Sequence, residues 1–143
     1  MGVSNQAILC VDDERTVLLG LRDQIAKHFG DRYRYEVAES ADEAWEVIEE
    51  LDQGGVHILI IVSDWLMPGM RGDEFLIQIH QRFPNIVTVL LTGHADEAAI
   101  ERARQHANLH AYIAKPWSEE TLIEVIRSGL RKFDDESGDC LCG

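Results

Sequence analysis

Cysteine is scarce in this chain, with three in 143 residues. Cys10 lies inside an apolar run, where a free thiol behaves as a small hydrophobe. Cys140 and Cys142 lie close to the C-terminus, and two thiols alone do not make a metal site. The paired framework that stabilises small secreted domains is missing. We therefore expect a reducing compartment, the cytoplasm.

Basic residues and long hydrophobic runs are also in short supply. No stretch approaches the roughly 18 apolar residues of a membrane helix, and the N-terminus lacks the basic and apolar regions of a signal peptide. Lys and Arg number 13 against 26 Asp and Glu, a formal net charge of -13. Such an acidic chain repels nucleic-acid phosphates and anionic lipids. We expect neither nucleic acid nor a membrane as a direct partner.

The chain does contain five alternations of strand-like and helix-like sequence. A length of 143 residues suits one domain with its own core. Strands separated by helices require right-handed crossovers and a parallel sheet, so we predict a doubly wound α/β domain. Strands are predicted at about residues 7–11, 33–38, 56–63, 86–91 and 109–114, and helices at about 14–29, 41–51, 72–82, 96–106 and 118–132.

The end of the chain differs in composition from the rest. Residues 134–143 are acidic, contain Gly and Ser, and have little apolar surface to bury. Such composition is typical of disorder. We predict a folded domain over residues 1–133 and, over 134–143, a disordered tail or the start of a linker.

Polar residues follow four of the predicted strands. Asp12 and Asp13 follow the first, Asp64 the third, Thr92 the fourth and Lys115 the fifth. The carboxyl ends of parallel strands share one edge of the sheet, where ligands bind. Three carboxylates, a hydroxyl and an ammonium would meet there, a composition that suits a divalent cation beside a phosphoryl group.

Each of these residues can be assigned a chemical role. A carboxylate that accepts a phosphoryl group must be exposed at a strand end, which fits Asp64. A divalent cation must offset the charge, which fits Asp13 together with Asp12. Fixed donors must meet the phosphoryl oxygens, which fits Lys115 and Thr92.

Simpler interpretations exist for every residue taken alone. Asp12 and Asp13 could cap the first helix, and Asp64 could be a turn residue. The joint pattern decides against these. Tyr112, on the fifth strand, is as readily a core residue as a switch. The six histidines show no metal-like spacing, and Trp45 and Trp117 are interpreted as packing residues.

At these positions the chain resembles the receiver domain of bacterial two-component response regulators. The resemblance covers about residues 8–132. The matching pieces, in chain order, are Asp12-Asp13, Asp64 followed by Met67-Pro68 and Gly72, Thr92-Gly93, and Tyr112 three residues before Lys115-Pro116.

The resemblance implies a flavodoxin-like (βα)5 sheet with strand order 2-1-3-4-5. It also implies that Asp64 takes a phosphoryl group from a phosphohistidine of a sensor histidine kinase or phosphotransfer protein. Mg²⁺ (or Mn²⁺) would bind Asp13, Asp64 and the backbone carbonyl of Leu66, with Asp12 bound directly or through water. Lys115 and Thr92 would contact the acyl phosphate.

The resemblance further implies a route to output. Thr92 would move toward the phosphoryl group and Tyr112 would swing inward, which alters the surface of the fourth helix, fifth strand and fifth helix. That surface could bind a target protein, act on a further domain, or form a weak phosphorylation-dependent homodimer. Enzymatic activity would be limited to self-phosphorylation and weak autodephosphorylation. Leu66 and His94 occupy positions that tune the phosphoryl lifetime.

Three other functions compete with this interpretation. A docking module that works without phosphorylation is favoured by a degraded acidic triad, and here the triad is intact. A phosphatase with an aspartate nucleophile needs a second acid two residues later, where this chain has Leu66. Flavin binding is disfavoured because the carboxylates would repel the flavin phosphate.

Overall fold

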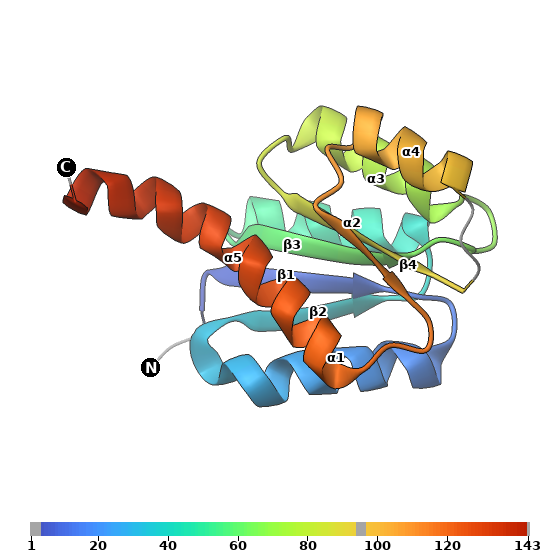
Figure 1. Ribbon diagram of the computed structural model, residues 1–143, viewed down its shortest axis with the longest axis horizontal. Helices are drawn as coiled ribbons and strands as arrows, with labels where there is room; N and C mark the ends of the chain where they lie inside the picture. Colours follow the sequence, from blue (N-terminus) through green and yellow to red (C-terminus); the bar gives the residue numbers. More distant parts are fainter. Residues whose placement is uncertain (1–3, 94–96, 143) are drawn as a thin grey trace.

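Five parallel strands form one sheet in the order β2-β1-β3-β4-β5, as predicted. The structure is a computed structural model that describes residues 4–93 and 97–142, with side chains up to residue 133. The strand ends shared along one edge are visible in Figure 1. The strands are β1 Gln6–Val11, β2 Arg34–Ala38, β3 His57–Asp64, β4 Val87–Thr92 and β5 Ala111–Ala114.

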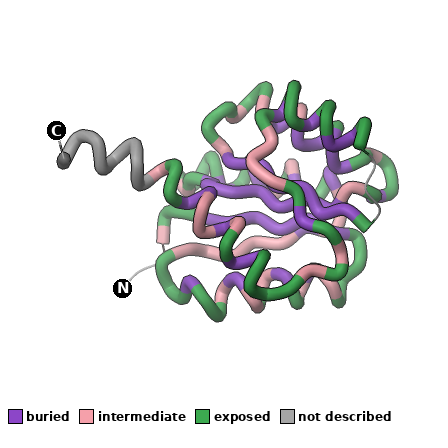
Figure 2. The backbone as a smooth tube through the Cα atoms, viewed as in Figure 1, coloured by how far each residue is buried: buried purple, intermediate pink, exposed green. Residues whose placement is uncertain are grey.

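Helices cover both faces of the sheet and enclose two separate cores. Helices α1 and α5 pack on one face, and α2, α3 and α4 on the other. Figure 2 shows the buried strands between these layers. The helices are α1 Arg15–Phe29, α2 Ala41–Gln53, α3 Gly72–Arg82, α4 Glu97–His106 and α5 Glu119–Cys142, with a short 3-10 helix η1 over Gly30–Arg32.

The central strands are apolar because both of their faces are buried. In β1, Ile8 and Cys10 face the α1–α5 core, whereas Leu9 and Val11 face the core under α2, α3 and α4. Strand β3 is buried from Ile58 to its end. Near-continuous apolar sequence is typical of parallel strands covered on both sides.

Local signals place several helix ends. Ser40 Oγ accepts a hydrogen bond from Glu43 N at 3.1 Å at the start of α2, where serine is a favourable N-cap. Gly30 has a φ of 65° at the end of α1, a conformation that favours glycine.

In α5, Gly129 permits close packing, since a Cβ there would meet Ile60 Cδ1 at 3.1 Å.

The predicted end of the last helix, near Lys132, is wrong. Helix α5 continues to Cys142, where the sequence predicts a disordered segment. The run Asp134-Asp135-Glu136 contains no proline, and a helix already formed by packed turns propagates at little cost per residue. The division of the chain after residue 133 stays a prediction. The side chains of Cys140 and Cys142 lie outside the described part.

The two tryptophans assigned to packing do pack. Trp45 is half-buried in α2, and its ring lies edge-on to Phe75 with centroids 6.0 Å apart. Trp117 packs against the α1–α5 core, and its Nε1 donates to Gln24 Oε1 at 2.8 Å. Among the described residues, no helix is long and apolar enough to cross a membrane.

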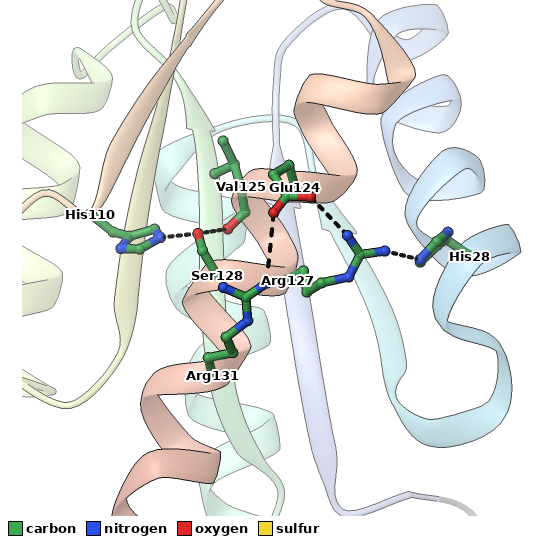
Figure 3. Close-up of polar contacts among 7 residues, drawn as sticks. All are labelled: His28, His110, Glu124, Val125, Arg127, Ser128 and Arg131. Carbon is green, nitrogen blue, oxygen red and sulfur yellow. Dashed lines mark hydrogen bonds and ion pairs between the residues drawn. The ribbon is translucent and has the colours of Figure 1, made fainter.

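Polar contacts also hold α5 against its neighbours (Figure 3). Ser128 Oγ donates to Val125 O at 2.9 Å, so it accepts from His110 Nε2 at 2.8 Å. Arg127 Nη2 in α5 donates to His28 Nε2 in α1 at 2.8 Å. Burial lowers the pKa of His110 below its usual 6.5, and the positive charge of Lys132 lowers it further. A backbone hydrogen bond with Val125 raises this pKa, but by less.

We predict that His110 weakens the fold in mild acid. Because its pKa is lower in the folded state, the unfolded chain binds more protons, and stability falls as pH drops below 6.5. His110→Gln should lessen the loss of stability between about pH 7 and about pH 5 in urea unfolding. The matched control is His106→Gln, at an exposed position in α4. An unchanged pH slope in His110→Gln would contradict the prediction.

Candidate functional site

The carboxyl edge of the sheet brings together the polar residues predicted there. Asp12 follows β1, Asp64 is the last residue of β3, and Lys115 follows β5. The Lys115 ammonium lies 2.9 Å from Asp64 Oδ1 and 3.0 Å from Asp12 Oδ2. Residues from three separate strand ends therefore form one ionic contact.

An acidic cluster surrounds this contact. Carboxylate oxygens of Asp12, Asp13 and Asp64 lie within 4.8 Å of one another. With the Lys115 ammonium beside them, the cluster retains two negative charges, which matches one divalent cation. Asp12 and Asp64 are buried, whereas Asp13 is exposed. Since Mg²⁺ takes carboxylate oxygens and keeps several waters, a carboxylate set open to solvent on one side fits it.

Burial and charge oppose each other at this site. Burial raises the pKa of Asp64, and the charges of Asp12 and Asp13 raise it further, while the hydrogen bond from Lys115 lowers it. Burial alone would lower the pKa of Lys115, but its bonds to Asp64 and Asp12 outweigh burial and raise it. Lys115 is therefore held as a cation, and Asp64 is a carboxylate crowded by like charges.

Asp12 also shapes the turn after β1. Its Oδ1 accepts from Glu14 N at 2.9 Å, while its Oδ2 contacts Lys115. Glu14 is the N-cap of α1 and provides no side-chain cap. Asp12 is therefore not the N-cap of α1 that the simpler interpretation predicts: one of its carboxylate oxygens forms a turn before the helix, and the other forms the ionic contact.

The remaining predicted site residues lie along the same edge. Thr92 ends β4 and is buried, and its carbonyl accepts from Lys115 N at 2.7 Å. Leu66 lies in the loop between β3 and α3, with 59% of its surface exposed. Tyr112 is 44% exposed and lies 6.0 Å below the Arg104 guanidinium, so it is not a core residue here. His94 lies outside the described residues.

A role that the sequence did not assign belongs to Gly72. Its N–H donates to Trp65 O at 2.7 Å, and a Cβ at this position would stand 2.0 Å from Asp64 O. The loop after β3 thus returns to the backbone of Asp64, and only glycine leaves room for this approach. The available signal was a glycine at the first position of a helix.

Comparisons with known proteins show the family to which the chain belongs. The family described as response regulator receiver domain matches residues 8–127. The chain belongs to this receiver family. It is 30% identical over 124 residues to chemotaxis protein CheY-3 of Vibrio cholerae, covering 85% of this chain and 89% of that one. The structure of a CheY-like receiver domain protein from Methanospirillum hungatei superimposes with a TM-score of 0.79, at 27% identity, over 92% of this chain and 98% of the other.

Other relatives are much longer than this receiver domain. The hydrogenase transcriptional regulatory protein HoxA of Cupriavidus necator is 31% identical over 130 residues, which is 91% of this chain and 25% of that protein. The matched region is 13% of the sensor kinase CckA of Brucella abortus. The receiver domain spans a quarter or less of the first curated relatives that it matches.

We predict that Gly72→Ala strains the loop between β3 and α3 of the receiver domain. The added Cβ would overlap the Asp64 carbonyl, so stability should fall by about 1–3 kcal/mol in urea unfolding. Gly20→Ala is the matched control: a Cβ there has no neighbour within 4 Å, and alanine should stabilise α1 by about 0.5–1 kcal/mol. Equal effects at the two positions would show that the close approach at Gly72 is unimportant.

Proposed function

We propose that this receiver domain is a phosphorylation-controlled signalling switch whose phosphoryl acceptor is Asp64. The observation that carries the proposal is the Lys115 ammonium, 2.9 Å from Asp64 Oδ1, beside the carboxylates of Asp12 and Asp13. A reactive carboxylate, a fixed cation and two metal-binding acids are the parts that phosphoryl transfer to aspartate requires.

The donor is a phosphohistidine of a sensor histidine kinase or phosphotransfer protein. An Asp64 oxygen attacks the phosphorus, the phosphorus–nitrogen bond breaks, and the electron pair stays on the histidine nitrogen. Asp13, Asp64 and the Leu66 carbonyl would hold Mg²⁺ (or Mn²⁺), with Asp12 bound directly or through water. When bound, the cation offsets the charge of the carboxylate and the phosphoryl group together.

Lys115 and Thr92 serve the transferred group. The Lys115 ammonium already sits on the acceptor oxygen, so it can follow that charge onto the phosphoryl oxygens. The Thr92 hydroxyl would donate to another of these oxygens. Hydrolysis of the acyl phosphate by water returns the switch to its resting state. The enzymatic activity is therefore phosphoryl transfer to the protein itself and weak autodephosphorylation.

Output would come from the surface formed by α4, β5 and α5. Tyr112 lies outward on this surface, so an inward rotation on phosphorylation would change its shape. A downstream protein or a further domain would bind the changed surface. The same surface could instead form a weak phosphorylation-dependent homodimer. We place the switch in the cytoplasm, with no direct contact to nucleic acid or membrane.

We expect Asp64 to be the only phosphoryl acceptor. Incubation with acetyl phosphate and Mg²⁺ should add one phosphoryl mass to the intact protein, and Asp64→Asn should abolish this addition. Asp52→Asn, at an exposed position in α2, is the control and should label like the wild type. Equal labelling of Asp64→Asn would place the acceptor elsewhere.

We expect Asp13 to carry much of the metal affinity. At Mg²⁺ concentrations tenfold above Kd, binding should stabilise the fold by about 1.4 kcal/mol and raise Tm by about 3–6 °C. Asp13→Ala should remove most of this rise, whereas Asp23→Ala, an exposed acid of α1, should preserve it. Calorimetric melting with and without Mg²⁺ measures both, and a full rise in Asp13→Ala would assign the metal to other residues.

A further inference from the structure

A third buried carboxylate lies outside the acidic cluster, in the first turn of α3. Asp73 is fully buried, and both of its oxygens face arginines. Its Oδ1 is 3.3 Å from Arg71 Nε, and its Oδ2 is 3.2 Å from Arg102 Nη1. Since an uncompensated buried charge is strongly unfavourable, these two half-exposed guanidinium groups are what makes the burial of Asp73 tolerable.

Asp73 is fixed in position relative to the phosphoryl acceptor. It directly follows Gly72, whose N–H donates to Trp65 O and whose Cα packs against the Asp64 carbonyl without room for a Cβ. A displacement of the backbone at Asp64 or Trp65 must therefore displace the start of α3, and Asp73 with it.

Asp73 is also connected to α4. Its partner Arg102 belongs to α4, a helix that packs mainly against α3. The buried side chains of α4 are small apart from one isoleucine: Ala99, Ile100 and Ala103. Because alanine buries little apolar surface, Ile100 is the one large buried side chain of α4, and the ion pair with Asp73 adds a polar contact to α3.

Arg102 and Arg104 give α4 one contact on each side. Residues two apart on a helix point in nearly opposite directions. Arg102 reaches Asp73 in α3, and Arg104 lies over the ring of Tyr112 in β5. Helix α4 is thus linked on one side to Asp73, which follows the acceptor loop (residues 65–71, between β3 and α3). On the other side it is linked to the exposed Tyr112.

We infer that the Asp73–Arg102 ion pair couples the acceptor loop to α4, so that Asp73 is a positioning residue through which the state of Asp64 sets the position of α4. This inference rests on the proposed function. It adds a route from the site to the output surface that runs through α3, separate from the one through Thr92 and Tyr112.

The first test concerns the protein without any phosphoryl group. Amide hydrogen exchange in α4 should become about 10-fold faster in Asp73→Asn and in Arg102→Gln, because either change removes the charged contact between α3 and α4. Arg102→Lys keeps the charge and should restore part of the protection. The matched control is Glu49→Gln, which removes the 3.1 Å pair with Arg82 between α2 and α3. Wild-type exchange in α4 of both the Asp73 and Arg102 variants would overturn the inference.

The second test adds beryllofluoride with Mg²⁺ as a phosphoryl mimic. In the wild type, backbone chemical shifts should change near Asp64 and in α4. In Arg102→Gln the changes near Asp64 should persist, while those in α4 should fall by about half or more. The Glu49→Gln control should respond fully.

The outcomes separate the two proposals. No chemical-shift change near Asp64 in the wild type would contradict the proposed function, and the coupling would fail with it. A wild-type response near Asp64 together with an undiminished α4 response in Arg102→Gln would overturn the coupling alone. Because Arg102 is half exposed, its substitution keeps the test informative even if Asp73→Asn fails to fold.

Discussion

The candidate site depends on one ammonium group. Without Lys115, the carboxylates of Asp12 and Asp64 would stand buried next to Asp13 with no ion-pair partner among the residues that the structure describes. The cation is delivered by the last strand, whereas the acids come from the first and third strands in sequence. The ionic contact can therefore form only when the sheet is assembled, which links the chemistry of the site to the completeness of the fold.

A second constraint is the close backbone approach at Gly72. It holds the loop between β3 and α3 against the start of α3, so that a displacement of the backbone at Asp64 must also displace the start of α3. The buried Asp73 extends this rigid path toward α4. Packed elements joined by short polar contacts tend to switch between discrete arrangements rather than deform gradually. Helix α4 buries mainly small side chains, which makes it the element best suited to such a movement.

Much of this arrangement follows from local sequence. Asp64 and Thr92 were found because a polar residue ending an apolar strand stands out, and parallel topology places such ends together. Asp73 was missed because an acid in the first turn of a helix normally needs no partner beyond the helix dipole. Its burial depends on Arg102, far along the chain. The outward side chain of Tyr112 and the length of α5 likewise depend on tertiary contacts and helix propagation that local patterns do not encode.

The sheet divides the interior into two compartments, and this has a consequence for protein engineering. The core under α1 and α5 is built from residues such as Leu21, Ile25 and Ile126. The links from Asp64 to α4 run on the opposite side. Stabilising substitutions in the α1–α5 core therefore lie away from the Asp73–Arg102 link, and those on α1 also lie away from the proposed output surface of α4, β5 and α5. Substitutions at α1 positions such as Leu21 or Ile25 can raise the thermal tolerance of this domain while the contacts of Asp73 stay in place.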